Sequence, residues 1–195
     1  ATVNISGNTV AGIQCGTTAG GALTGITSTG SVTSSAIINN NFLGTSTLNW
    51  VSFPFANTNA TTVLAINISG LGGATLHSIQ NNEIRGISFS STSSRPFTFL
   101  TLTGATAAND VSTISNNTFT ALNLSTTGAI NFINHGYSIA ATGTLNVTNN
   151  SIVTSFTKTG ASGTVTLTST NSSSAAGAVY NYTGNNFSNI SITGA

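Results

Sequence analysis

The chain has 195 residues, of which Thr, Ser, Asn and Gly contribute 109, whereas only 5 are Asp, Glu, Lys or Arg. The net charge of +1 excludes nucleic-acid binding through a cluster of basic side chains, and no apolar run approaches the roughly 20 residues that span a bilayer. With 38% hydrophobic residues the chain can form a packed core, and its abundant Val, Ile, Thr and Phe favour strands.

The first predicted element is a turn that recurs along the whole chain. It follows the pattern of Gly or Asn, then Asn, then any residue, then Val, Ile or Phe. It occupies residues 7–10, 39–42, 81–84, 116–119, 149–152 and 184–187. The Asn at its second position recurs after 32, 42, 35, 33 and 35 residues. A period in this range is typical of a solenoid, in which each repeat is buried only by its neighbours.

Each turn is followed by the same series of predicted strands. A short alternating segment comes directly after it, and a stretch rich in Gly, Ser and Thr separates this segment from a longer alternating run. The longer runs lie at 63–69, 97–104, 129–134 and 164–170. A third short run then leads into the next turn. Three segments of period two, with no helical period, predict a three-sided coil, and we expect residues 1–195 to form a single all-β domain of about five coils.

The recurring Asn predicts a ladder at one corner of these coils. Stacked coils place equivalent residues about 4.8 Å apart, so each side-chain amide can bond to the amides above and below it. The residue before it, Gly or Asn, tolerates the left-handed conformation that a tight corner requires. The predicted ladder consists of Asn8, Asn40, Asn82, Asn117, Asn150 and Asn185.

With this repeat, the chain resembles a right-handed parallel β-helix, the fold of pectate-lyase-like enzymes, phage tailspikes and many secreted bacterial adhesins. The repeats are most similar to the Ser/Thr/Asn-rich β-helix arrays of long secreted surface proteins. The resemblance implies an extracellular or cell-surface location. The fold hosts unrelated activities, so it does not by itself imply one of them.

Catalytic and metal sites are not expected from the ionisable residues. Glycoside hydrolysis uses two carboxylates about 5–10 Å apart, whereas the repeat alignment separates Glu83 from Asp110. Cys15 falls in an inward column of apolar residues, which favours a buried and inert thiol. His77 and His135 are expected on different sides of the coil without an acidic or thiol companion. We therefore expect no enzymatic activity, no metal and no cofactor.

Two groups of residues provide the alternative of a binding module. In the longest repeat, Trp50, Phe53 and Phe55 either stack on a neutral glycan from an exposed loop or fold back onto the coil wall. Along the long strands, Thr residues alternate with inward residues, as on the flat face of an ice-binding solenoid. The column is interrupted at Ala65, Asn67, Ala129, Asn131 and Ile133, and the high β-propensity of Thr explains it equally well. The candidate ice-binding residues are Thr27, Thr29, Thr101, Thr103, Thr166 and Thr168.

The predicted function is structural: an extracellular rod that serves as a fibre subunit or as the stalk of an adhesin. The sequence contains no amphipathic segment that would cap either end of the solenoid, whose terminal coils would otherwise leave strand edges open. We therefore expect either a segment of a longer array or self-association of copies, end to end or side by side. Glycan or ice binding is the alternative.

Overall fold

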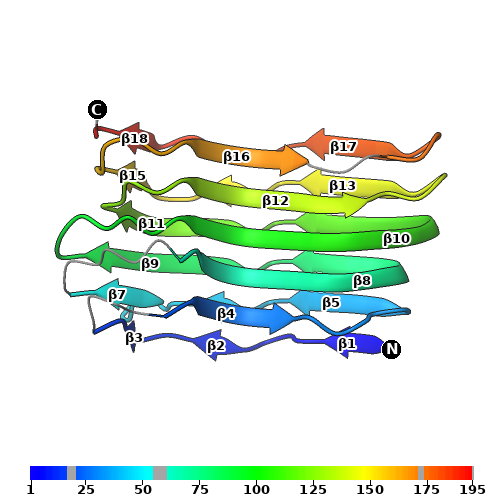
Figure 1. Cartoon of the computed structure of the whole chain (residues 1–195), viewed down its shortest axis with the longest axis horizontal. Helices are drawn as coiled ribbons and strands as arrows, with labels where there is room; N and C mark the ends of the chain where they lie inside the picture. Colours follow the sequence, from blue (N-terminus) through cyan, green and yellow to red (C-terminus); the bar gives the residue numbers. More distant parts are fainter. Residues whose placement is uncertain (17–20, 55–60, 171–173, 195) are drawn as a thin grey trace.

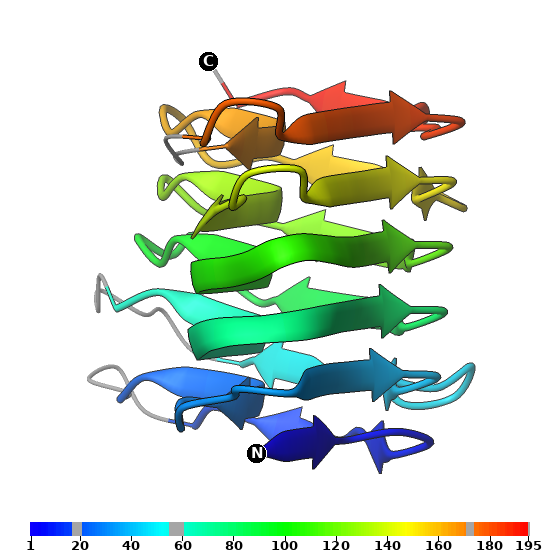
Figure 2. The same ribbon diagram turned by 90° about the vertical axis from the view of Figure 1, so that its right-hand side faces the viewer.

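The computed structural model describes residues 1–16, 21–54, 61–170 and 174–194. Within these residues every regular element is a strand, with no helix, and every strand pairing is parallel. Figure 1 shows the coils stacked in chain order from the N-terminus to the C-terminus, and Figure 2 shows the same stack from a second side. The protein is a right-handed parallel β-solenoid of about five turns, as predicted.

Three faces form the wall of the solenoid. The first face holds the long strands: β4 (Leu23–Ser28), the first part of β8 (Val63–Gln80), the first part of β10 (Phe97–Ser115), β12 (Ile130–Ser138) and β16 (Val165–Thr170). The second face leads to the Asn corner and holds β1 (Thr2–Asn4), β5 (Ser35–Asn39), the later parts of β8 and β10, β13 (Thr144–Thr148) and β17 (Val179–Thr183).

The third face follows the Asn corner. It holds β2 (Thr9–Val10), β3 (Ile13–Gln14), β6 (Phe42–Leu43), β7 (Val51–Phe53), β9 (Glu83–Phe89), β11 (Thr118–Leu124), β14 (Ser151–Ile152), β15 (Phe156–Lys158) and β18 (Ile190–Ile192). In the third and fourth coils this face is one continuous strand, whereas the first, second and fifth coils divide it in two.

A ladder of Asn side chains runs through the corner between the second and third faces. At each step, the side-chain and backbone nitrogens of one Asn donate to the Oδ1 atom of the Asn in the following coil. The side-chain bonds, Nδ2 to Oδ1, are 2.9–3.0 Å long and join Asn8, Asn41, Asn82, Asn117, Asn150 and Asn185. The residue before each ladder Asn has a positive φ, between 54° and 72°. The corner therefore combines a left-handed backbone with a satisfied, mostly buried amide.

The second rung corrects the prediction of Asn40. Three successive Asn residues, 39–41, each suit this turn, and the structure uses Asn40 for the left-handed position, with φ of 58°. Asn41 is consequently the buried ladder residue. The shift also turns the next two side chains around: Phe42 points outward and is 43% exposed, while Leu43 is fully buried. The pairing of Phe42 with Glu83 and of Leu43 with Ile84 fixes this register.

Large apolar side chains fill the interior from coil to coil. Phe132 contacts rings from neighbouring coils, with centroid distances of 5.1 Å to Phe99, 5.0 Å to Phe119 and 5.1 Å to Phe156. These four rings are fully buried. Such tilted and edge-to-face contacts contribute stabilisation beyond the burial of apolar area, so the stacked rings stabilise the packing of the middle coils on one another.

The second coil carries an insertion directly after its ladder corner. Leu43 pairs with Ile84 and Val51 with Ile87, so this coil has five more residues here than the third coil. The extra residues form a loop over 44–49. The oxygen Oγ1 of Thr45 accepts the backbone N–H groups of Thr47 and Leu48, at 3.3 and 2.9 Å, which fixes the turn of the loop.

Gly44, where this loop begins, is expected to tolerate no side chain. Its φ is +98°, and an added Cβ would lie 2.0 Å from the carbonyl oxygen of Arg85. We expect Gly44→Ala to lower the free energy of unfolding by about 3 kcal/mol through backbone strain and overpacking. Gly73→Ala is the control, because φ is +79° there but the space is open, and it should cost about 1 kcal/mol. Equal losses in denaturant titrations of the two variants would contradict the predicted clash.

Candidate functional site

The ionisable residues of the second face meet inside the solenoid. His77 on β8 and Ser112 on β10 share one inward column, because Ser112 pairs with His77. The nitrogen Nδ1 of His77 is 2.8 Å from the hydroxyl oxygen of Ser112, and this hydroxyl donates to Oδ2 of Asp110. Nδ1 of His77 is also 3.6 Å from Oδ2 of Asp110. All three residues have no exposed surface.

Hydrogen bonding and burial together act on the protonation of the cluster. The Ser112 hydroxyl donates to Asp110 and can accept from Nδ1 of His77 when this nitrogen carries the proton. Burial lowers the pKa of His77 from 6.5 to about 4, so its imidazole is neutral at pH 7. Burial also raises the pKa of Asp110, against the opposing effect of its hydrogen bonds to Ser112 and to the backbone at Val111. The cluster is therefore a hydrogen-bonded structural network.

The prediction that His77 has no acidic companion is wrong. The companion is Asp110 in the next coil, and the sequence contains one sign of it: Asp110 and Ser112 alternate in phase with the inward column. Serine, histidine and aspartate are the residues of a hydrolytic triad, but here serine lies between the other two and no member reaches solvent. Glu83 is separate from this cluster and pairs with Arg85, at 2.7 Å. Among the described residues, the two acidic side chains, Glu83 and Asp110, do not face each other.

Two further ionisable side chains are buried in the wall of the solenoid. Arg95 is almost fully buried; it donates to the carbonyl oxygens of Gly21 and Thr61 and lies 5.9 Å from the ring centre of Phe53. Lys158 is fully buried and donates to the carbonyl oxygens of Gly160 and Ser162. Burial lowers the pKa of Lys158. Both cations therefore donate to backbone carbonyl oxygens within the wall.

His135 on β12 lies in the C-terminal part of the interior. Its Nε2 atom bonds to the hydroxyl of Tyr182 on β17, which also bonds to Thr168. The ring of Tyr180 stacks on His135 at a centroid distance of 5.9 Å. Burial lowers the pKa of His135 from 6.5 to about 4. In the last coil, Tyr180 and Tyr182 thus occupy the positions that Leu145 and Val147 hold in the coil before it.

The predicted aromatic platform for a glycan is not present at Trp50 and Phe53. Both side chains are buried, and Phe53 stacks on Phe89 at a centroid distance of 4.7 Å. Phe55 lies outside the described residues. The five-residue insertion begins earlier, at Gly44, so the chain has already returned to the wall at Trp50. The alternative of folding back onto the wall is the one that the structure shows for these two residues.

The predicted Thr array is also not formed as a single column. Thr27 and Thr101 share a column, but it continues through Asn67, Asn134 and Ser169. Thr168 aligns instead with Ile26, Ile66, Leu100 and Ile133, which are buried. The reason is that the alternation of inward and outward side chains is interrupted within the long strand, where the neighbours Phe99 and Leu100 both point inward. Thr166, before this step, and Thr101, after it, therefore lie in different columns. Thr103 pairs with Gly136, and the strand pairings do not extend to Thr29.

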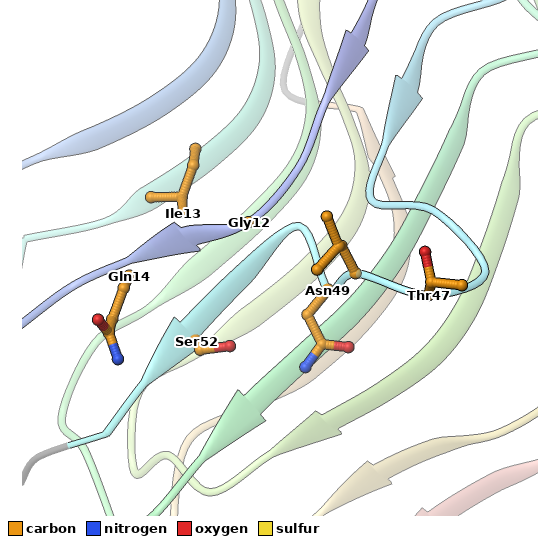
Figure 3. Close-up of a pocket in the computed structure, with 7 residues that line it drawn as sticks. Gly12, Ile13, Gln14, Thr47, Asn49 and Ser52 are labelled. Carbon is orange, nitrogen blue, oxygen red and sulfur yellow. The ribbon is translucent and has the colours of Figure 1, made fainter.

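An open groove of about 400 Å³ lies beside the inserted loop (Figure 3). It is lined by Gly12, Ile13, Gln14, Thr47, Leu48, Asn49 and Ser52. Figure 3 shows the polar groups of Gln14, Asn49 and Ser52 on the same side of the ribbon. Asn49 donates to the hydroxyl of Ser88, which in turn donates to Ser52. No residue of this groove titrates near neutral pH, so it offers hydrogen bonds without acid–base chemistry.

The remaining candidate, Cys15, is half-buried and packs against the core, and burial raises the pKa of its thiol. The part of the chain that the structure describes contains no group of three or more His, Cys, Asp or Glu residues that could hold a metal ion. In the same residues, no helix is long and apolar enough to cross a membrane. Comparison with models of protein families, with curated proteins and with solved structures finds no match to this chain.

Proposed function

We propose that the chain is a non-catalytic structural solenoid, which acts as an extracellular rod: a fibre subunit or the stalk of a surface adhesin. The observation that carries the proposal is the Asn ladder, which continues through six successive corners with the same bonding at every step. Such a repeated ladder stabilises the length and shape of the solenoid, and because its rungs are equivalent, none of them is a unique binding or catalytic site. The resemblance to secreted β-helix arrays supports the same function.

The location of the charged side chains supports a structural role. Of the five Asp, Glu, Lys and Arg residues, Arg95, Asp110 and Lys158 are buried and bonded within the wall. They cannot reach a substrate from there. The surface is covered mostly by Thr, Ser and Asn, whose hydration does not depend on pH, as an extracellular rod requires. Low charge also permits rods to pack side by side without repulsion.

The ladder has a direction, which supports end-to-end continuation. Each rung donates through nitrogen to the following rung. Among the described residues, no hydrogen bond engages the Oδ1 atom of Asn8 or the backbone N–H of Asn185. An acceptor at one end thus complements a donor at the other. A further coil, from the same chain or from a second copy, would extend the ladder without a change in its geometry.

Electron microscopy of the purified chain, with thermal hysteresis measured on the same sample, tests this proposal. We expect filaments and no hysteresis. Asn8→Lys should abolish filaments, because a positive side chain replaces the ladder acceptor, while Asn4→Lys on the outer face of the same coil should retain them. A dispersed monomer that shapes ice crystals would refute the rod. Filaments that persist in Asn8→Lys would refute its end-to-end assembly through the ladder.

A further inference from the structure

The exposed ring of Phe42 occupies an exceptional position on the third face. Its outward column holds Thr9 in the first coil, Glu83 in the third, Thr118 in the fourth and Ser151 in the fifth. Phe42 is the large apolar member of this column, and 43% of its surface is exposed. No ring or cation contact with another described residue involves it. A single exposed ring is not unusual on a protein surface, so its significance here depends on the groups that surround it.

Two partly exposed charged side chains, Glu83 and Arg85, line the same cleft as this ring. Glu83 pairs with Phe42 across adjacent strands, and Arg85 follows two residues later on the same face. Both Nε and Nη2 of Arg85 are 2.7 Å from Oε1 of Glu83. Among the described residues, no hydrogen bond engages Oε2 of Glu83 or Nη1 of Arg85. The pair is thus held in place and electrically neutral, with one acceptor and one donor group available.

The inserted loop converts this surface into a cleft. The cleft has a volume of about 280 Å³ and is lined by Thr9, Phe42, Gly44, Thr45, Ser46, Glu83 and Arg85. Loop residues and the ion pair therefore line the same cleft, and the backbone N–H groups of Thr47 and Leu48, which donate to Thr45, fix the turn of the loop. Sites for drug-sized ligands measure roughly 300–1,000 Å³, so this open cleft suits one small ring.

We propose that the Phe42 cleft binds a single neutral pyranose unit of a glycan. An aromatic ring offers its face to the C–H groups on one side of a sugar ring, which gains apolar burial while the hydroxyls stay outward. Neighbouring hydroxyls of a sugar both donate and accept, and the Glu83–Arg85 pair offers an acceptor beside a donor. The neutral pair and the hydroxyls of Thr9, Thr45 and Ser46 disfavour a charged ligand. This site is distinct from the groove of Figure 3.

Saturation-transfer NMR with methyl pyranosides tests the proposal on the purified chain. The probes are methyl β-D-glucopyranoside, methyl β-D-galactopyranoside and methyl α-D-mannopyranoside, with acyclic sorbitol as the negative probe. We expect at least one pyranoside to bind saturably, with the strongest transfer to the ring protons of one sugar face. Phe42→Ala should weaken its binding roughly tenfold, and Phe42→Trp should retain it.

Val111→Ala is the matched control, since Val111 is also an exposed apolar strand residue, 50% exposed, on the second face. It should leave binding unchanged. Retained binding in Phe42→Trp together with loss in Phe42→Ala cannot arise from misfolding of the coil. Absence of saturable binding for all three pyranosides overturns the proposal, and so does equal binding by Phe42→Ala and the unaltered chain. Sugar binding by the Phe42 cleft does not depend on the proposed rod function, because it requires neither filaments nor end-to-end contacts.

Discussion

Replacing Asn117 by leucine should lower the free energy of unfolding by about 4 kcal/mol. Asn117 is fully buried, and its Oδ1 atom accepts both the backbone and the side-chain nitrogen of Asn82, at 3.1 and 2.9 Å. Its own side-chain nitrogen donates to Oδ1 of Asn150 and to the carbonyl oxygen of Ile79, at 2.9 Å each. Leucine would leave these buried partners without hydrogen bonds, and each such group costs about 1–3 kcal/mol.

The measurement is a denaturant titration followed by the fluorescence of Trp50, the single tryptophan, which is fully buried. Asn123→Leu is the control, because Asn123 is exposed on the same strand, β11. Its stability should change by less than about 0.5 kcal/mol. If Asn117→Leu were no less stable than Asn123→Leu, the ladder would contribute nothing to the fold.

Acid should destabilise the protein between pH 6.5 and about 4. Burial lowers the pKa of His77 and of His135 from 6.5 to about 4 in the folded state. The unfolded chain therefore binds more protons in this range, so the stability is complete above pH 6.5 and falls as the pH decreases. At about 1.4 kcal/mol per pKa unit, each histidine accounts for roughly 3 kcal/mol. Asp110 acts in the opposite direction, since its raised pKa lets the folded state take up a proton above pH 3.8.

Titrations in denaturant at a series of pH values from 7 to 4 measure this dependence. Replacing His77 by glutamine should remove about half of the loss, and replacing both histidines should remove nearly all of it. The slope against pH is the diagnostic quantity, because a glutamine can change stability equally at every pH. If the slope from pH 6.5 to 4.5 were the same with and without the two histidines, neither imidazole would be held neutral by burial.

The sequence by itself determined the architecture, because the corner is a local structure. A left-handed residue followed by Asn, repeated every 33–41 residues in the structure, fixes where each coil turns. The alternation of apolar and polar residues between the turns then gives the three faces. Five of the six ladder residues follow from this pattern alone: Asn8, Asn82, Asn117, Asn150 and Asn185.

Tertiary structure decided which of several equivalent residues occupies a position. Asn40 and Asn41 suit the corner equally in local terms, and only pairing with the third coil places Asn41 in the ladder and Phe42 at the surface. The contact between His77 and Asp110 depends on the register of stacked coils, which shifts between Thr106 and Val111.

For Thr168 and Trp50, too, the sequence alone did not determine whether the side chain points inward or outward. The change of phase at Phe99 and Leu100 aligns Thr168 with a buried column. The return of the inserted loop buries Trp50. In both cases either set of alternate side chains can point inward, and the two arrangements have similar local energy. The choice between them depends on side chains in the neighbouring coils, which are about 4.8 Å away in space but some 35 residues distant in the chain.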